Sequence, residues 1–407
     1  MRNVEDALIE YATQYTPPGS NVKSVINQWI HAIVYEHDLF AKNRGVTKNE
    51  IVNRLKKAGI YKSKEQFNKL VTKEIHIKPK SNDFTFIDLF AGIGGMRLGF
   101  QKSNGVCVFS SEFEKNAQET YSNNFGEFPF GDITKISPKD IPDHDILIGG
   151  FPCQPFSHAG LKLGIDDTRG TLFYNIAKIL EHKRPKFALL ENVKGLISHD
   201  NGHTLNIILK TLTSLGYKCI IDDGVINSNS PTKLKKDAAK MVLKSVDFGV
   251  PQNRQRIYIV LWRKDLNINF KYPEPKKNKV LVGSILEENP DKKYTISDKL
   301  WEGHKNRKIK NKLSGKGFGY GIVNEESEYT NTISARYYKD GSEILVEQKG
   351  KNPRKLTPRE ASRLQGFPKN FIINKSDVQA YKQFGNSVSV PVIEAIAKEI
   401  SKYIENA

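Results

Sequence analysis

The chain has 407 residues and a formal net charge of +18, from 63 Lys and Arg against 45 Asp and Glu. Hydrophobic residues make up 38% of it, which supports globular cores and excludes a wholly disordered chain. We find neither a signal-peptide pattern nor a long apolar segment, and the three cysteines are an odd number. We therefore expect a protein of the reducing cytoplasm with no membrane partner. Its excess positive charge attracts phosphates, which favours a nucleic-acid partner.

Residues 1–83 carry helical patterns and precede the strongest motifs of the chain. Thr47 predicts the start of a capped helix that stops at Gly59, and Ser63 predicts the start of a second helix. Two short helices around a glycine turn are compatible with a helix-turn-helix. A packing appendage is the simpler interpretation and the one that we favour, although the sequence does not settle the role of this extension.

From residue 84 onward, apolar strands alternate with helical patterns, which predicts a parallel α/β sheet. An apolar strand containing Asp88 runs into a Gly-x-Gly-Gly turn at 92–95. Glu112 ends the next strand about twenty residues later, a spacing that suits the hydroxyls of a ribose. The turn is too short for a pyrophosphate, so a nucleoside cofactor without phosphates fits better than NAD or ATP. An ordinary strand–helix turn is the alternative, and Asp88 either bonds this turn or touches the cofactor.

A cysteine follows the next predicted strand, at 145–148. Residues 149–157 read Gly-Gly-Phe-Pro-Cys-Gln-Pro-Phe-Ser, so Pro152 and Pro155 bracket Cys153 and Gln154. Proline cannot continue a strand, and we expect a stiff loop at the carboxyl end of the strand, where open α/β sheets bind ligands. A thiolate placed there can act as a nucleophile. Taken alone, the loop is also compatible with a buried core cysteine.

Charged residues lie at the ends of two later apolar runs. A predicted strand at 185–193 ends in Glu191 and Asn192. Arg254 and Arg256 alternate into another buried strand, so we expect both guanidinium groups to point to one side. The remaining cysteines, Cys107 and Cys219, lie within apolar runs and are expected in the core.

These segments, in this order, resemble the C5-cytosine DNA methyltransferases, especially the bacterial type II restriction–modification enzymes, over about residues 84–405. Any one of the motifs could arise by chance, but all six in order are highly specific. They are the glycine turn at 86–95, Pro-Cys-Gln at 152–154, Glu-Asn-Val at 191–193, Gln-x-Arg-x-Arg at 252–256, the segment 354–368 that begins Arg-Lys-Leu-Thr-Pro-Arg-Glu, and Phe-Gly-Asn-Ser at 384–387.

The resemblance implies a Rossmann-like S-adenosylmethionine-dependent methyltransferase domain at 84–273 and a smaller, irregular target-recognition domain at 274–370. Residues 371–407 would return to complete the catalytic domain. Residues 1–83 would form a mainly helical N-terminal extension that precedes it in the chain. The chain departs from the family pattern at one place. After a predicted strand at 217–226 it contains a basic insert, 227–244, where compact family members need fewer residues. A solvated loop is the default expectation for this insert, and contact with the DNA backbone is the alternative.

The chemistry of the reaction explains the residue types in the motifs. Carbon 5 of cytosine is a poor nucleophile until a thiolate adds at carbon 6 and turns the ring into an enamine. A carboxylic acid at N3 and an arginine at O2 then stabilise the developing charge. The resemblance assigns these roles to Cys153, Glu191 and Arg256, with Arg254 beside them. It does not identify the base that removes the carbon 5 proton.

The resemblance also assigns the S-adenosylmethionine contacts and implies S-adenosylhomocysteine as the product. No histidine–cysteine ligand spacing occurs, so we expect no metal. The predicted cofactor residues are Phe90, Gly92 and Gly94 around the methionine and ribose, Ile93 through its backbone, Glu112 at the ribose, Phe113, Asp132 and Leu172 around the adenine, and Asn386 and Ser387 at the methionine part.

Double-stranded DNA is the implied partner, bound by a monomer and with the target cytosine rotated out of the duplex. The predicted DNA-contacting residues are Gln154, Ser157, Thr332, Arg336, Tyr337 and Lys339. Arg336, Tyr337 and Lys339 either contact base edges or only bind phosphates. The DNA sequence that the enzyme recognises cannot be predicted from them. The enzyme is expected to protect DNA from a partner restriction endonuclease. The alternatives are a tRNA cytosine-5 methyltransferase and an inactive DNA-binding regulator of the same fold.

Overall fold

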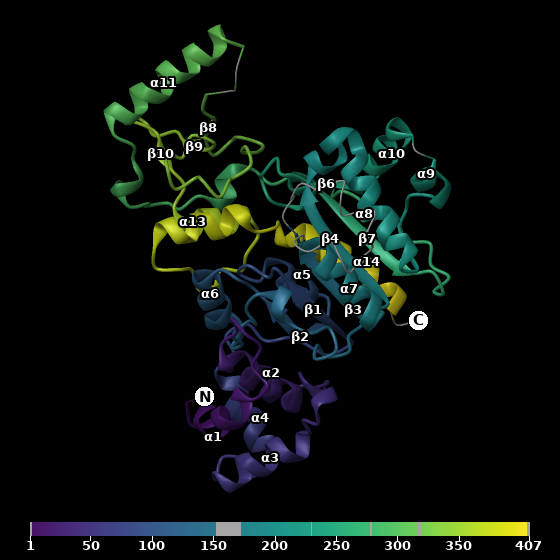
Figure 1. The fold of residues 1–407 in the computed structure, drawn as a ribbon. Helices are drawn as coiled ribbons and strands as arrows, with labels where there is room; N and C mark the ends of the chain where they lie inside the picture. Colours follow the sequence, from purple (N-terminus) through teal and green to yellow (C-terminus); the bar gives the residue numbers. More distant parts are fainter. Residues whose placement is uncertain are drawn as a thin grey trace. The chain divides into compact units, whose positions relative to one another are not determined.

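The computed structural model describes residues 2–151, 172–228, 230–276, 279–315, 317 and 319–404, which form two compact units (Figure 1). The first unit comprises Met1–Leu243, Arg256–Pro273 and Ile396–Ala407. The second comprises Lys244–Gln255 and Glu274–Ala395. Among the described residues, no helix has the length and apolar character that crossing a bilayer requires.

The first unit is built on a mostly parallel sheet in the strand order β2-β1-β3-β4-β7-β5, with β6 paired to β7. Strand β1 pairs in parallel with β2 and β3, and β3 with β4, whereas β7 runs antiparallel to β4 and β5. This arrangement confirms the predicted Rossmann-like α/β fold. The strands are β1 Phe84–Leu89, β2 Gly105–Ser111, β3 Ile146–Gly150, β4 Phe187–Val193, β5 Tyr217–Lys218, β6 Val242–Lys244 and β7 Gln255–Arg263.

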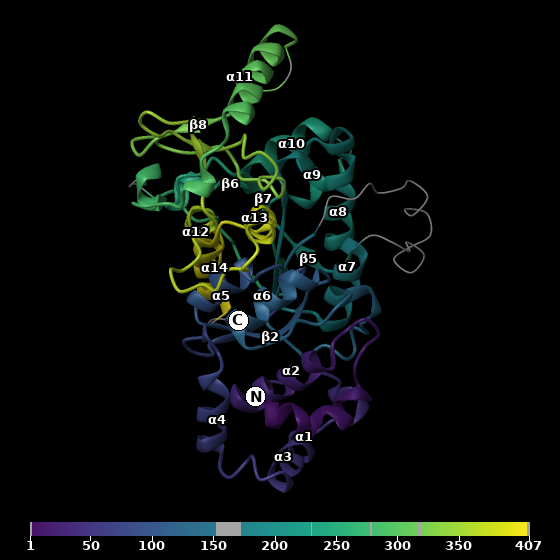
Figure 2. The same ribbon diagram turned by 90° about the vertical axis from the view of Figure 1, so that its left-hand side faces the viewer.

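Helices flank this sheet, as two views at right angles show (Figures 1 and 2). The central strands are apolar on both faces, as expected for strands covered on both sides, and Ile146, Leu147 and Ile148 of β3 are fully buried. Cys107 and Cys219 are also buried, which confirms that they are core residues. The helices that follow the strands are α5 Gly95–Lys102, α6 Lys115–Phe125, α7 Leu172–Lys183, α8 His203–Ser214 and α14 Val390–Ile404, the last of which continues from the second unit into the first.

Two local expectations after α8 were wrong. The strand predicted at 217–226 is limited to β5, and helix α9 (Asp223–Asn227) begins after Asp222, whose side chain accepts a hydrogen bond from the amide of Gly224. The insert 227–244 is not a loop, because it contains α10 (Pro231–Ala238), a 3-10 turn and β6. Proline is well tolerated in the first turn of a helix, and apolar side chains recur at a helical spacing. Those buried side chains are Leu234, Ala238 and Met241.

The N-terminal extension contributes four helices to the first unit. They are α1 Arg2–Thr13, α2 Val22–Val34, α3 Lys48–Lys57 and α4 Lys64–Lys73. The side chains of Thr47 and Ser63 accept hydrogen bonds from the amides of Glu50 and Gln66, which confirms the two predicted capped helices. The connection 58–63 between α3 and α4 is longer than the three or four residues typical of a helix-turn-helix.

Helix α2 docks the extension onto the sheet and the segment that follows α6. Gln28 donates from Nε2 to the carbonyl of Val108 in β2 at 3.1 Å. Ser24 donates from Oγ to the carbonyl of Pro129 at 2.8 Å, and the amide of Phe128 donates to Oδ1 of Asn27 at 3.0 Å. Because these side chains are buried and satisfy backbone groups of the sheet domain, the extension is an integral part of the first unit.

A buried charge network joins α2 to α5. Arg97 of α5 donates from Nη2 to Oε1 of Glu127 at 2.7 Å and from Nη1 to the hydroxyl of Tyr121 at 2.9 Å. Nδ1 of His31 lies 2.6 Å from the same Oε1 of Glu127. Burial raises the pKa of Glu127, but Arg97 and then His31 outweigh it and hold that pKa well below its usual range. A carboxylate therefore holds the extension to the helix that follows the glycine turn.

The second unit is smaller and less regular. A three-stranded sheet in the order β10-β9-β8 is its core element, and Arg354 and Glu360 form a buried pair with hydrogen bonds of 2.7 and 2.8 Å. Thr357 and Glu360 form a capping box at the start of α12. The elements are β8 Ile322–Val323, β9 Leu345–Val346, β10 Arg354–Lys355, α11 Asp298–Leu313, α12 Pro358–Leu364 and α13 Asp377–Asn386.

Candidate active site

The predicted nucleophile lies outside the described residues, as do Gln154 and Ser157. The structure describes the strand that leads toward Cys153, β3, and the buried Phe151 that follows it. Asn192 at the end of β4 donates from Nδ2 to the carbonyl of Phe151 at 2.8 Å and is 3% exposed. Asn192 therefore ties together the carboxyl ends of β3 and β4. The sequence analysis placed Asn192 in a motif but gave it no role, since its partner is distant in the chain.

Glu191 and Arg256 meet on neighbouring strands. Arg256 pairs opposite Val193 in the antiparallel ladder of β4 and β7, so Glu191, two residues earlier, lies on the same face. Its Oε1 lies 3.3 Å from Nε of Arg256, with 12% and 17% of the two side chains exposed. A side chain at Gly150 would come within 3.2 Å of Oε2, so glycine leaves room for this carboxylate. The structure thus brings together two of the predicted catalytic side chains.

Arg254 has different partners from Arg256. It precedes β7, lies in the second unit and is 3% exposed. Its guanidinium donates to the carbonyls of Ser387 at 2.7 Å and of Ile333 and Gly385 at 3.4 Å. The sequence analysis expected the guanidinium groups of Arg254 and Arg256 to point to one side, and these hydrogen bonds give Arg254 partners within its own unit. Arg254 connects two segments within the second unit.

The glycine turn and Glu112, together called the cradle, lie side by side at the ends of β1 and β2. The amide of Gly92 donates to Oε2 of Glu112 at 2.7 Å, and the amide of Glu114 donates to Oε1 at 2.7 Å. Burial raises the pKa of Glu112, whereas these backbone donors lower it. A carboxylate oxygen can accept two hydrogen bonds, so one amide donor leaves each oxygen able to accept a second from a ribose hydroxyl. The spacing read from the sequence therefore corresponds to a direct contact.

The backbone of this turn is adapted for close approach. Phe90, Gly92 and Gly94 have φ angles of 56°, 54° and 83°, in the left-handed region that favours glycine. A Cβ at Gly94 would lie 2.2 Å from the ring of Phe125, whereas one at Gly92 would meet nothing within 4 Å. Gly94 is thus required for packing, and Gly92 leaves open space beside the carboxylate of Glu112. Ile93 between them is 2% exposed, which leaves its backbone for any ligand contact.

Two of the predicted adenine residues lie near the end of β2, because Phe113 follows that strand and Asp132 follows Phe130, which bridges to Ser111. Phe113 is 78% exposed, which is unusual for a phenylalanine and suits a flat aromatic ligand. Asp132 accepts from the amide and the hydroxyl of Thr134 through Oδ1, at 3.0 and 2.7 Å. Leu172 is half-buried at the start of α7. Among the described residues, no group of three or more His, Cys, Asp or Glu is arranged to hold a metal ion.

The other predicted residues lie in the second unit. Asn386 is exposed at the end of α13, and Ser387 follows it. Thr332 donates from Oγ1 to the carbonyl of Asn253 at 2.9 Å, while Arg336 and Lys339 are exposed. Tyr337 corrects our expectation, because it is fully buried and donates to the carbonyl of Ile344 at 2.6 Å. A side chain held in the core in this way is unavailable to DNA.

Glu112→Ala is expected to weaken S-adenosylmethionine binding. A hydrogen bond to a charged group contributes ~1.5–3 kcal/mol, which corresponds to a roughly tenfold or larger rise in the dissociation constant. Calorimetric titration measures this change, and Glu119→Ala, at an exposed position of α6, is the matched control. Unchanged affinity in a folded Glu112→Ala protein would remove Glu112 from the site.

Asp88 in β1 predicts a pH dependence of stability. Its side chain is buried, and burial raises its pKa from 3.8 to about 8 despite the opposing charge of Arg97. The folded state therefore keeps a proton that the unfolded state loses, so stability falls as pH rises from 3.8 to about 8.

Asp88→Asn, which does not titrate, is expected to flatten this dependence and to raise the melting temperature relative to wild type near pH 8. Thermal unfolding between pH 5 and 9 measures it, with the exposed Asp83→Asn as control. A melting curve of Asp88→Asn that tracks wild type across this range would contradict the assignment.

Comparison with known proteins extends the likeness beyond single motifs. The family model described as C-5 cytosine-specific DNA methylase matches residues 84–402. The type II methyltransferase M.SsoII of Shigella sonnei is 59% identical over 327 residues, which are 79% of this chain and 81% of that protein. M1.ScrFI, a type II methyltransferase of Lactococcus lactis subsp. cremoris, is 58% identical over 332 residues, or 81% of this chain and 80% of that protein.

Solved structures share the fold at lower identity. A mutant of DNMT2 from Spodoptera frugiperda matches with a TM-score of 0.59 and 23% identity over 79% of this chain and 99% of its own. The Dnmt2 methyltransferase of S. pombe matches with a TM-score of 0.57 and 20% identity over 79% and 99% of the two chains. At these identities the likeness establishes the fold alone.

Proposed function

Since the chain belongs to the C-5 cytosine-specific DNA methylases and is a DNA cytosine methyltransferase, we propose that it methylates carbon 5 of a cytosine rotated out of a short, specific duplex site. The pairing of Glu191 with Arg256 supports this proposal most directly. The two side chains lie at the carboxyl end of β4, beside the end of β3 from which the chain continues to Cys153. A thiolate, an acid and a guanidinium are the groups that attack at carbon 6 requires.

In the proposed reaction, the Cys153 thiolate bonds to carbon 6 while Glu191 gives its proton to N3 and Arg256 stabilises O2. The electron pair released to carbon 5 forms the new bond to the methyl group. Bound S-adenosylmethionine supplies that methyl group on a sulfonium, and the sulfur keeps the electron pair of the broken bond. A base then removes the carbon 5 proton, the bond from carbon 6 to sulfur breaks, and N3 returns its proton to Glu191.

The cofactor would occupy the cradle formed by the glycine turn and Glu112. The carboxylate is oriented by two backbone amides, the space beside Gly92 is open, and Phe113 presents an exposed ring. These features fit a ribose and an adenine without phosphates. Asn386 and Ser387 remain predicted contacts of the methionine part.

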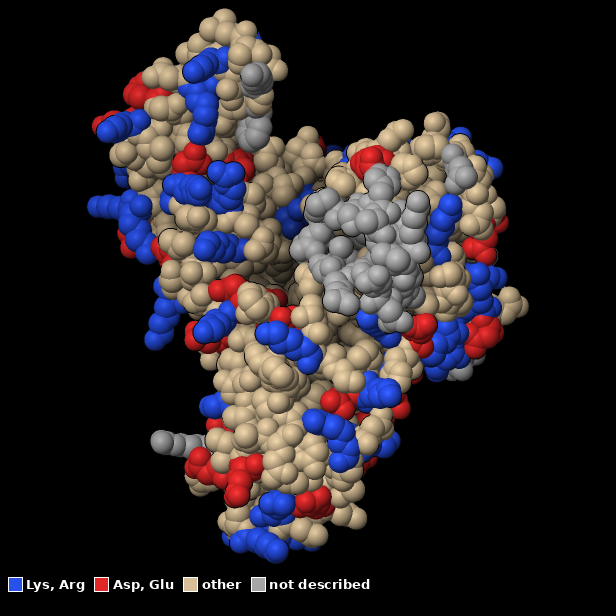
Figure 3. Space-filling model, in the orientation of Figure 1, with Lys and Arg blue, Asp and Glu red and all other residues tan. Residues whose placement is uncertain are grey.

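We assign DNA recognition to the second unit. Figure 3 shows Lys and Arg side chains spread over both units with Asp and Glu among them, as suits a protein that binds phosphates. Helix α11 buries only His304, so most of its side chains face solvent. Its basic residues are Lys299, Lys305, Arg307, Lys308, Lys310 and Lys312. Because the relatives are named type II methyltransferases, a partner restriction endonuclease is part of the proposal.

Bisulfite sequencing of genomic DNA from a host that expresses the protein tests the function. Protected cytosines are expected within one short recurring sequence, and a host expressing Cys153→Ser is the control. Purified protein offered duplex DNA and transfer RNA should methylate the duplex. Absence of protected sites, or methylation of transfer RNA alone, would refute the proposal.

Arg336→Ala is expected to relax the recognition sequence at one base position. An exposed arginine can pair with a guanine through two hydrogen bonds, which discriminate by ~1–3 kcal/mol. Methylation of a library with randomised sites measures the change, and Lys339→Ala serves for comparison. Uniform loss over all sites with an unchanged sequence preference would mean that Arg336 holds only phosphates.

A further inference from the structure

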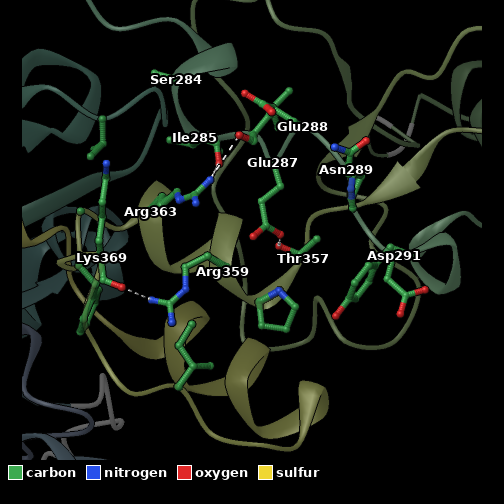
Figure 4. Close-up of a pocket in the computed structure, with 18 of the residues that line it drawn as sticks. Ser284, Ile285, Glu287, Glu288, Asn289, Asp291, Thr357, Arg359, Arg363 and Lys369 are labelled. Atoms are coloured by element: carbon green, nitrogen blue, oxygen red, sulfur yellow. Dashed lines mark hydrogen bonds between the residues drawn. The ribbon is translucent and has the colours of Figure 1, made fainter.

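An open pocket of about 990 Å³ lies within the second unit (Figure 4). Its walls come from residues 284–291, from the first turns of α12 and from residues 366–369. Gly249, Val250 and Pro391 also line it. None of the side chains assigned above to catalysis, the cofactor or base reading lines it, so its chemistry calls for a separate explanation.

Three cations line this pocket. Arg359 and Arg363 are four residues apart on α12 and so lie on one face of the helix, and Lys369 follows nearby. Like charges at this spacing repel each other. Nη1 of Arg359 donates to the carbonyl of Lys369 at 3.1 Å, and Nη1 of Arg363 donates to those of Ile285 at 3.1 Å and Leu286 at 3.3 Å. A carbonyl accepts a hydrogen bond but does not neutralise a charge.

Two of the three carboxylates that line the pocket have hydrogen-bond donors other than the arginines. Glu287 accepts from Oγ1 of Thr357 through Oε2 at 2.6 Å, and Asp291 accepts from the amide of Lys293 at 2.9 Å. In Figure 4, Glu287 is turned toward Thr357, whereas Arg359, Arg363 and Lys369 lie on the other side. Within the described part of the chain, neither arginine forms an ion pair with Glu287, Glu288 or Asp291.

Partial burial and the neighbouring charge of Arg363 both disfavour the charged form of Arg359. Burial and then the charge of Arg363 lower the pKa of Arg359, and Glu287 opposes them only in part. A structural arginine of the same unit looks different, because Arg354 is buried against Glu360 with two hydrogen bonds. A guanidinium group without a carboxylate partner can still form charge-assisted hydrogen bonds with an anion.

We propose that Arg359, Arg363 and Lys369 form a binding site for a phosphate group. Guanidinium groups match the oxygens of a phosphate with paired hydrogen bonds, and each arginine uses only Nη1 for its carbonyls. The open pocket admits a phosphate carried by a larger molecule, either the backbone of a nucleic acid or a free phosphate compound. The site is additional to methyl transfer and does not depend on it.

Thermal unfolding of the full chain in sodium phosphate and in sodium chloride of equal ionic strength tests this site. Phosphate is expected to raise the melting temperature of the wild type beyond the effect of chloride. The double variant Arg359→Gln/Arg363→Gln should lose that increment, whereas Lys349→Gln/Lys351→Gln, at exposed positions outside the pocket, should keep it. The melting temperature of each variant in phosphate is compared with that of the same variant in chloride, so a variant that is less stable overall does not affect the result. An increment that persists in the double arginine variant, or is absent from wild type, overturns the proposal.

Binding of duplex DNA at several salt concentrations distinguishes the two sources of the phosphate. A backbone phosphate at this site predicts that the slope of log K against log salt becomes shallower by about 0.9 per lost contact in the double arginine variant. A free phosphate compound predicts an unchanged slope together with loss of the inorganic phosphate increment. Methyl transfer by the wild type is measured separately, so failure of the proposed function is distinguishable from failure of this site.

Discussion

Cys153→Ser is expected to abolish methyl transfer to duplex DNA while leaving DNA binding largely unchanged. A hydroxyl is a far weaker nucleophile than a thiol at neutral pH, so carbon 6 would not be attacked and carbon 5 would stay unreactive. Methyl incorporation from labelled S-adenosylmethionine measures the loss, and gel-shift titration measures DNA binding. Cys219→Ser, at a buried cysteine of the same unit, controls for the general effect of replacing a thiol.

The two variants separate chemistry from folding. Burial raises the pKa of Cys219 to about 11, so its thiol is not the reactive one, and the control should keep its activity if it folds. Wild-type turnover in Cys153→Ser would refute the nucleophile outright. Loss of DNA binding together with turnover would instead point to a structural role for the cysteine.

Glu127→Ala is expected to produce the largest loss of stability. It leaves Arg97 buried without its carboxylate and removes the group that joins α5 to His31 of the N-terminal extension. Breaking a buried ion pair by removing one partner costs ~3–5 kcal/mol. Denaturant unfolding followed by circular dichroism measures this loss, and Glu119→Ala on α6 should cost far less because that side chain is exposed.

The contribution of Glu127 also has a defined pH range. Its pKa in the folded protein is lower than its ordinary value of 4.5, so the stabilisation is present above that value and disappears as pH falls. The difference between wild type and Glu127→Ala should therefore shrink in acid. A difference that is constant from pH 7 to pH 3 would contradict an ionised Glu127 as the connecting group.

Local signals in the sequence predicted those parts of the fold that depend on near neighbours. Thr47 and Ser63 cap helices because the amides that they accept from lie three residues away. Glu112 and the glycine turn, both recognised from their spacing, lie in contact because adjacent parallel strands bring their carboxyl ends together. In both cases the residue type and a short spacing carry the whole interaction.

Features that depend on distant partners were not predictable in the same way. Arg254 and Arg256 share one alternating pattern, yet one donates to carbonyls near 333 and 387 and the other meets Glu191. Tyr337 follows an exposed arginine, and contacts with residues distant in the chain, such as Leu356 and Tyr381, place it in the core. The helix at 231–238 was missed because its basic residues outweighed the spacing of its few apolar ones.

Covalent trapping tests the central claim most directly. Duplex DNA with 5-fluorocytosine in place of the target cytosine is incubated with wild-type protein and S-adenosylmethionine, and the complex is digested and examined by mass spectrometry. Fluorine at carbon 5 blocks the final elimination, so a stable adduct is expected with carbon 6 bonded to Cys153 and a methyl group on carbon 5. No adduct, or an adduct on another residue, would contradict the assignment of this chain's methyl transfer to Cys153.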